Sequence, residues 1–288
     1  MASRETIPTE DNRLAVCNAG VVSFLNARPL WKFLAGRDGL TIMPSVPSGL
    51  ARMLADGRCD IALLPVVDYW RARRRLTRVS NACIASDGET MTVRVFSKTP
   101  PERLERLQID ADSHTSVVLA QLLWLERYRR ELELVPWRAA PRESHPALGP
   151  PGLSGPGTAS GRTKTSFEGV EAVLLIGDKV IGNAPEGYPF EIDLGAAWKE
   201  LTGLPFVFAA WYGSKEKDHA AAARMLEEAR DAGVAIAEQI AEEEAPQRGW
   251  PRDVAVRYLC EKMRYTLTEA MRAGMDRFFS MAYERGLL

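Results

Sequence analysis

The chain has 288 residues, of which 46% are hydrophobic and 26% are charged. This balance is typical of a globular protein, and the length suits one large domain or two lobes of ordinary size. Lys and Arg number 37 against 38 for Asp and Glu, so no broad positive field favours nucleic acid as a partner.

The N-terminal residues and the cysteines bear on where the chain works. Residues 1–12 contain no apolar stretch, so we expect a disordered lead-in and not a secretory signal. No run approaches the roughly 18 apolar residues that a membrane span needs. The three histidines show no ligand-like spacing, so no metal site is expected. Three of the four cysteines lie in apolar, strand-like segments, which favours reduced buried thiols in a cytoplasmic protein; the four are Cys17, Cys59, Cys83 and Cys260.

The first half of the chain alternates strand and helix signals. Apolar runs predict strands at 14–17, 40–43 and 60–64. A helical pattern at 24–34 has Pro29 in or just before its first turn. A second helix follows Ser48, a good N-cap, and stops at Gly57. Alternation of this kind within about 50 residues predicts a parallel sheet with right-handed crossovers.

A second unit of strands and helices begins after Pro100 and Pro101. Two strands, at 79–85 and 91–96, precede it, and it contains a helix at about 115–128 and strands at 107–109, 132–135 and 170–176. We interpret it as a second small α/β lobe. Residues 138–168 are rich in Pro, Gly and Ser and cannot bury enough apolar surface to offset ordering of the chain. They predict a flexible surface insertion, with a functional lid as the alternative.

The C-terminal part of the chain has a helical pattern. Apolar residues at spacings of three and four predict amphipathic helices packed on a sheet, at about 218–244, 251–262 and 264–286, separated by Pro246 and Pro251. We therefore expect one lobe to comprise 13–97 and 206–288 and the other 98–205, with two crossovers between them.

Four polar segments stand where open α/β sheets place ligands. The first, V-S-F-L-N-A-R-P-L, contains Asn26, whose carboxamide can donate and accept, and Arg28, a partner for a carboxylate. A helix cap and a solvated arginine are the alternatives. The second, P-S-G-L, places Ser48 at a helix N-terminus, where free N–H groups attract anions. Its alternative is a cap without a ligand.

The third segment runs from Ser86 through a turn to Arg94. Strand alternation predicts that Thr92 and Arg94 share one face and meet a substrate there, unless the strand is merely half-exposed.

The fourth segment crowds hydroxyl groups at the start of a helix. Hydroxyls and free backbone amides together make a carboxylate cradle, with helix capping as the alternative. Its candidate residues are Ser113, His114, Thr115 and Ser116, of which the histidine is open to a structural role.

A weaker candidate is L-L-I-G-D, which brings Gly177 and Asp178 to a sheet edge. None of these segments is a nucleophile elbow, a P-loop or a dinucleotide fingerprint. The residues alone indicate a binder of a small anion between two α/β lobes.

Five segments in this order carry a family resemblance. They are V-S-F-L-N-A-R-P-L, then P-S-G-L followed by D-G-R-C-D-I-A-L-L-P-V, T-S-V-V-L-A-Q-L-L, L-L-I-G-D and D-L-G-A-A-W-K-E-L-T-G-L-P-F-V-F-A-A-W. With them the chain resembles the chorismate dehydratases of the futalosine route to menaquinone, over about residues 13–288 apart from the insertion. The resemblance implies an α/β, two-lobed type-II periplasmic-binding-protein-like fold with a helical C-terminal segment. It also implies elimination of water from chorismate, a small dianion, to give 3-[(1-carboxyvinyl)oxy]benzoate without a cofactor.

The resemblance also implies roles for single residues. It puts Asn26 in the active site, together with a small hydroxyl residue in the strand that contains Thr92. Ser is the usual residue there, so Thr92 is a departure, and His114 stands where the family has Arg. No strong general base is visible, which leaves the substrate's own carboxylate. A homodimer is compatible with this interpretation. The alternatives are the enzyme of the same route that cleaves cyclic dehypoxanthinyl futalosine, and a non-enzymatic small-anion-binding protein.

Overall fold

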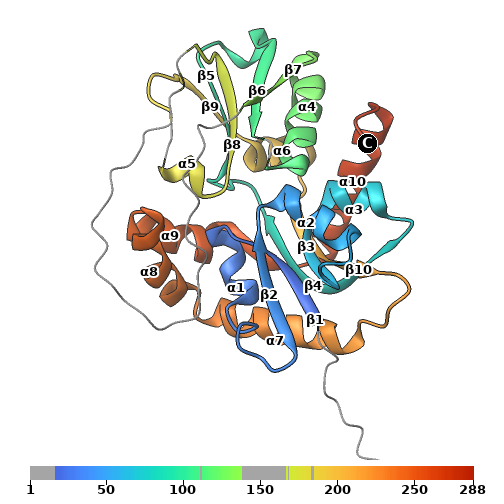
Figure 1. Cartoon of the computed structure of the whole chain (residues 1–288). Coiled ribbons are helices and arrows are strands. Elements are labelled where there is room, and N and C mark those ends of the chain that lie inside the picture. Colours follow the sequence, from blue (N-terminus) through green and yellow to red (C-terminus); the bar gives the residue numbers. More distant parts are fainter. Residues whose placement is uncertain (1–16, 111, 138–166, 168, 183–184) are drawn as a thin grey trace, which may run out of the picture.

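The computed structural model describes residues 17–110, 112–137, 167, 169–182 and 185–288. Two β-sheets form two lobes, one above the other in Figure 1, and the chain passes between them twice. The expected lead-in at 1–12 lies outside the described residues, as does the expected insertion at 138–168 except for Phe167.

The lower lobe in Figure 1 is built on a six-stranded sheet in the order β11-β4-β10-β3-β1-β2. Its strands are β1 (Cys17–Val22), β2 (Leu40–Ser45), β3 (Ile61–Pro65), β4 (Leu76–Ser86), β10 (Phe206–Ser214) and β11 (Met263–Thr266). The predicted parallel arrangement of β1, β2 and β3 is confirmed. Strand β10 runs antiparallel to both β3 and β4. Every residue of β3 is buried, as expected for a central strand covered on both faces.

Short helices follow the first three strands. They are η1, a 3-10 turn (Leu25–Ala27), α1 (Arg28–Trp31), α2 (Pro47–Ala55) and α3 (Val66–Ala72). Pro29 occupies the first turn of α1, as predicted. The expectation that Ser48 caps α2 is wrong, because Pro47 already stands in the helix and Val46 takes the capping position. Proline has a fixed φ and no N–H to satisfy, so it starts the helix one residue earlier.

The upper lobe has a five-stranded sheet in the order β7-β6-β8-β5-β9. The strands are β5 (Val93–Ser97), β6 (Arg106–Asp110), β7 (Glu133–Trp137), β8 (Ala172–Ile176) and β9 (Phe190–Asp193), with helices η2 (Pro101–Arg103), α4 (His114–Tyr128), α5 (Asp178–Gly182) and α6 (Leu194–Thr202). Strand β5 pairs with β8 and β9. The chain therefore enters this sheet between Ser86 and Val93, earlier than the division at residue 97 expected from the sequence.

The C-terminal segments return to the lower lobe. They are α7 (Ala220–Ala235), α8 (Ala237–Arg248), α9 (Arg252–Arg257), the π-helical turn η3 (Tyr258–Lys262), β11 and α10 (Glu269–Glu284). Helix α7 packs on α1 and β4, and α10 packs on β10. The expected break at Pro246 is wrong, since this proline lies inside α8. The expected helical start at 264 is also wrong, because Met263 and Tyr265 alternate with exposed residues as a sheet edge requires.

Buried side chains carry the stability of both lobes. Trp198 of α6, Phe206 of β10 and Phe278 of α10 meet edge to face. Cys17, Cys59 and Cys83 are buried free thiols, as predicted, and Cys260 is exposed. Burial raises the pKa of the Cys83 thiol to about 12, which keeps it protonated and unreactive.

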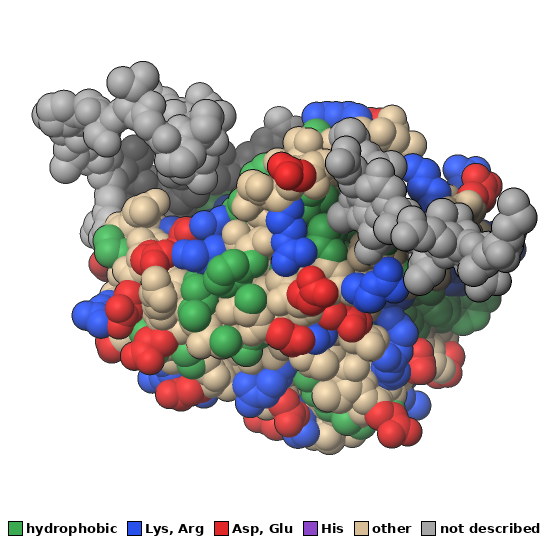
Figure 2. All heavy atoms as spheres, turned by 90° about the horizontal axis from the view of Figure 1, so that it is seen from below, with side chains coloured by type: hydrophobic (Ala, Val, Ile, Leu, Met, Phe, Trp, Pro, Cys, Tyr) green, Lys and Arg blue, Asp and Glu red, His purple; other side chains and the backbone are tan. Residues whose placement is uncertain are grey.

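The surface is evenly charged on the face shown in Figure 2. Basic and acidic side chains are interspersed there, as near-equal counts of 37 and 38 would produce. Exposed ion pairs contribute little stability each, so the fold depends mainly on its core. Within the described ranges, no helix has the length and apolar character that crossing a bilayer requires.

A tight helix contact provides a test of the packing. Gly233 of α7 lies so close to α1 that an added Cβ would sit 1.9 Å from the Pro29 carbonyl oxygen. Gly233→Ala must push the two helices apart, and we expect it to lower the free energy of unfolding by about 1–3 kcal/mol, as overpacking does. Thermal unfolding measures this. Gly182→Ala is the matched control, because a Cβ there meets nothing within 4 Å. Equal melting of the two variants would contradict the packing of α7 on α1.

Candidate functional site

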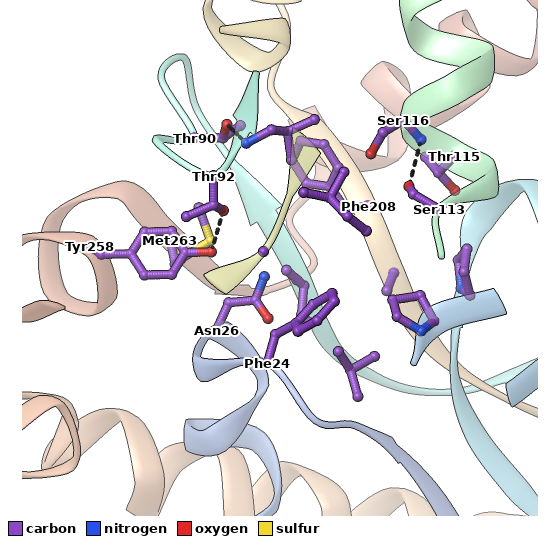
Figure 3. Close-up of a pocket in the computed structure, with 18 residues that line it drawn as sticks. Phe24, Asn26, Thr90, Thr92, Ser113, Thr115, Ser116, Phe208, Tyr258 and Met263 are labelled. Carbon is purple, nitrogen blue, oxygen red and sulfur yellow. Dashed lines mark hydrogen bonds between the residues drawn. The ribbon is translucent and has the colours of Figure 1, made fainter. Parts of the chain in front are cut away.

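A cavity lies between the two lobes. It encloses about 550 Å³ including its open mouth, and residues of both sheets line it. Figure 3 shows side chains from η1, the segment before β5, the start of α4 and η3 pointing toward one another around it. The polar lining consists of Asn26, Thr90, Thr92, Ser113, Thr115, Ser116 and Tyr258. Phe24, Phe208 and Met263 contribute apolar walls.

One side of the cavity holds a buried pair of hydroxyl groups. The Thr92 Oγ1 and Tyr258 Oη atoms are 2.6 Å apart, and both residues are buried. Burial raises the pKa of Tyr258, and its hydrogen bonds with Thr92 and Asn26 oppose that rise to a smaller extent. The phenol is therefore protonated at neutral pH. Among the described residues the Asn26 Oδ1 atom is buried with no hydrogen-bond partner.

The loop that carries Thr92 is held by Asp193. This carboxylate accepts hydrogen bonds from the Thr90 N–H at 3.0 Å, the Thr90 hydroxyl at 3.0 Å and the Met91 N–H at 2.8 Å. It also caps α6 by accepting from the backbone of Gly195 and Ala196. Met91 adopts the left-handed conformation with φ 62°, which is strained for a residue other than glycine. Asp193 thus fixes an unusual turn directly before Thr92.

The opposite side of the cavity is the start of α4. Ser113 is its N-cap and accepts from the Ser116 N–H at 3.2 Å. Thr115 Oγ1 accepts from the Val67 N–H of α3 at 3.3 Å, so its own proton is left for a further acceptor. The structure brings together the three hydroxyl residues of the predicted cradle, and all three are buried cavity residues.

The N-termini of α2 and α4 meet at this side. Pro47, the first residue of α2, lines the cavity, and the Ser48 N–H donates to the Asp112 carbonyl oxygen at 3.2 Å. Helix N-termini carry partial positive charge, so two of them at one wall attract an anion. Ser48 contributes a backbone contact between the lobes, and its side chain is not part of the cavity lining.

Gly177 lets the two lobes approach each other beside the cavity. It has φ 61°, its N–H donates to the Thr92 carbonyl oxygen at 2.8 Å, and an added Cβ would lie 2.6 Å from the Phe24 ring. Asp178 is not among the residues that line the cavity. It accepts from the Leu25 N–H at 3.1 Å and pairs with Arg248 at 2.5 Å. Burial raises the pKa of Asp178, and the Arg248 charge opposes that rise.

Several residues that the sequence singled out make their contacts outside the cavity lining. Arg28 pairs with Glu244 at 2.7 Å, and His114 Nδ1 lies 2.7 Å from Asp68 Oδ1. Ser86 donates its hydroxyl to the Gly88 carbonyl oxygen at 3.0 Å.

Of the predicted pair Thr92 and Arg94, Thr92 lines the cavity and Arg94 is not among the lining residues. Strand β5 begins at Val93, and the bond from the Gly177 N–H to the Thr92 carbonyl oxygen continues its pairing with β8 by one residue. Arg94 instead pairs with Glu89 at 2.9 Å and Glu191 at 3.1 Å.

The cavity also contains residues that the sequence did not single out. Thr90 and Phe24 lie inside the polar segments described above, so those segments indicate their position at the site. Tyr258, Phe208 and Met263 come from the C-terminal third, where only amphipathic periodicity was visible. Within the described part of the chain, no three His, Cys, Asp or Glu side chains gather as metal ligands would.

Solved structures share this fold across nearly the whole chain. A protein from Archaeoglobus fulgidus has a TM-score of 0.66 at 16% identity, covering 94% of this chain and 98% of that one. The periplasmic aliphatic sulphonate binding protein of Escherichia coli has a TM-score of 0.59 at 15% identity, covering 94% and 88%. A Candida albicans protein described as having the generic periplasmic binding protein fold has a TM-score of 0.53 at 10% identity, covering 96% and 91%. The predicted fold class is confirmed.

Proteins related in sequence identify the family of this chain. A chorismate dehydratase of Thermus thermophilus is 29% identical over 276 residues, which cover 90% of this chain and 92% of that protein. The model of a menaquinone biosynthesis family matches residues 17–147 and 159–284. These matches cover both lobes and every segment that lines the cavity, so the chain belongs to the menaquinone biosynthesis family.

Proposed function

We propose that this protein removes water from chorismate and gives 3-[(1-carboxyvinyl)oxy]benzoate. The observation that carries the proposal is the cavity between the lobes, where Asn26 and Thr92 face a cluster of hydroxyl groups across an apolar middle. Chorismate has the matching chemistry, with carboxylates around an apolar ring. The Thermus thermophilus relative supports the reaction, and the family supports the place in menaquinone biosynthesis.

The hydroxyl cluster supplies the carboxylate site. Ser113, Thr115 and Ser116 stand at the positive end of α4, beside the start of α2. Hydrogen bonds to an ionised acceptor are about twice as strong as neutral ones, so neutral donors suffice to bind a carboxylate. Phe24 and Phe208 contact the ring.

The opposite wall supplies the chemistry. The substrate loses a proton from C3 and its hydroxyl from C4, and these leave as water while the ring becomes aromatic. Thr92 donates a hydrogen bond to the departing oxygen, and the Asn26 amide orients the substrate. The described lining contains no Asp, Glu, His or Lys side chain, so a carboxylate of the substrate takes the C3 proton.

The proposal places the reaction in the futalosine route and in the cytoplasm. The menaquinone family and the free buried thiols support these assignments.

Incubation of the pure protein with chorismate tests the proposal directly. We expect the cyclohexadiene absorbance to disappear and a benzoate spectrum to replace it, with one water lost in the product mass. Chorismate that binds in calorimetry but stays unchanged would support a non-enzymatic binding protein instead, a role that the E. coli sulphonate binding protein has on the same fold. Neither binding nor turnover would reject chorismate as the ligand.

Asn26→Ala tests the reactive wall. We expect kcat to fall by roughly two to four decades, the range for losing a positioned polar group, with little change in melting temperature. Steady-state dehydration and thermal unfolding give both values. A variant with wild-type kcat and intact melting would remove Asn26 from the reaction.

Thr115→Ala tests the carboxylate cradle. A cradle binds ground state and transition state alike, so we expect KM to rise by about 10-fold or more while kcat stays within a few-fold. Thr115→Ser is the matched control, because it keeps the hydroxyl that accepts from Val67. If the serine variant lost as much affinity as the alanine variant, packing of the methyl group and not hydrogen bonding would explain the effect.

A further inference from the structure

Tyr258 is a buried tyrosine whose hydroxyl meets two residues that the proposed dehydration uses. Its Oη atom lies 2.6 Å from Thr92 Oγ1, and its ring stacks on Trp250 with centroids 5.2 Å apart. In Figure 3 the nitrogen of the Asn26 amide is turned toward the same phenol. The ring is fully packed, so the phenol oxygen has a fixed position at the cavity wall.

The backbone around Tyr258 is unusual. It opens the π-helical turn η3, between α9 and β11, and π-helical turns are rare and frequently lie at functional sites. This turn sets the Tyr258 side chain toward the upper lobe, where Thr92 stands in the turn before β5. The contact therefore joins two segments 166 residues apart in the sequence and crosses from one lobe to the other.

The acidity of the groups assigns a donor and an acceptor to each hydrogen bond at Tyr258. A phenol is a stronger acid than an aliphatic hydroxyl, so Tyr258 donates its proton to Thr92 Oγ1. The Asn26 amide nitrogen is turned toward the phenol oxygen, which can accept from it. Asn26 Oδ1 is buried and has no partner among the described residues. Thr92 then keeps its own hydroxyl proton to donate, and the residue lines the cavity.

We propose that Tyr258 is a positioning residue that holds the Thr92 hydroxyl with its proton directed at the substrate. The inference rests on the proposed dehydration and extends it. Without the phenol, Thr92 can rotate about χ1 and donate elsewhere, so the departing oxygen would lose an oriented donor. Binding of the substrate, which depends on the hydroxyl cluster of α4, would not change.

The variant Tyr258→Phe removes only the phenol oxygen. We expect kcat for chorismate to fall about 10- to 100-fold with KM within about twofold, as for one lost hydrogen bond of roughly 1.4–2.7 kcal/mol. Tyr265→Phe is the matched control. It is a buried tyrosine in β11 whose hydroxyl has no partner among the described residues and does not line the cavity. It should keep wild-type kcat and KM.

Double variants at Tyr258 and Thr92 distinguish a positioning role of Tyr258 from direct proton donation. In a Thr92→Val background we expect Tyr258→Phe to cause no further loss of kcat, because no hydroxyl remains to be oriented. In a Thr92→Ser background the loss should return, because the hydroxyl is restored. Additive losses in the Thr92→Val background would overturn the inference and make Tyr258 itself the proton donor. Unchanged kcat in Tyr258→Phe would overturn it as well.

Stability provides a readout that needs no substrate. If the hydrogen bond exists, the double variant Thr92→Val with Tyr258→Phe should melt higher than the sum of the single losses implies, since neither partner is left unpaired. Strictly additive melting shifts would overturn the contact. If the wild-type protein fails to turn over chorismate, the dehydration proposal fails on its own, while the melting cycle still reports on the Tyr258 contact with Thr92.

Discussion

The Asp193 carboxylate is the constraint on which the cavity depends. It binds the loop at Thr90 and Met91, about a hundred residues earlier in the chain, and it also caps α6. Hydrogen bonds to a charged acceptor contribute about 1.5–3 kcal/mol each. Those bonds offset the strain of Met91 at φ 62°, which is of order 1–3 kcal/mol. Thr92 follows that strained turn, so its hydroxyl is placed by a carboxylate that does not touch the cavity itself.

A second property of the site is that its polarity comes from neutral groups. Nearby cations are already paired with acids, as Arg28 is with Glu244 and Lys179 is with Asp112. Hydroxyl protons and helix ends remain for an anionic ligand. A strong ion pair would hold substrate and product about equally, whereas oriented neutral donors can favour the charge that develops on a departing oxygen. Such a lining suits a reaction whose product is also an anion.

The sequence predicts those parts of the molecule that depend on local signals. Buried apolar runs indicate the parallel strands β1 to β3, and hydroxyl residues at a helix start indicate the cluster of Ser113, Thr115 and Ser116. Asn26 is a predicted site residue because it is a polar residue inside an apolar stretch of the sequence.

Contacts between segments that are distant in the sequence cannot be predicted from local patterns. Tyr258 lies in a pattern that predicts only an amphipathic helix, and its role depends on a strand pairing, β11 with β4, that no local pattern indicates. Arg94 pairs with Glu191, 97 residues away in the sequence, so no local pattern indicates that this arginine lies outside the cavity lining. Pro246 lies within α8, which ends two residues later at Arg248. The tertiary context therefore overrides the helix-breaking tendency of this proline.

Hydrogen bonds between the lobes on two sides of the cavity govern how a ligand is exchanged. Val67 binds Thr115 and Asp68 binds His114 on one side, while Leu25 and Arg248 bind Asp178 on the other. Parting the two lobes requires bonds of this kind to break, so an exchange of ligand that needs a wider cavity would follow the movement of whole lobes, on the order of microseconds to milliseconds. The same bonds hold Asn26 of one lobe and the hydroxyl cluster of the other around a single cavity, so a ligand that fills it contacts both lobes at once.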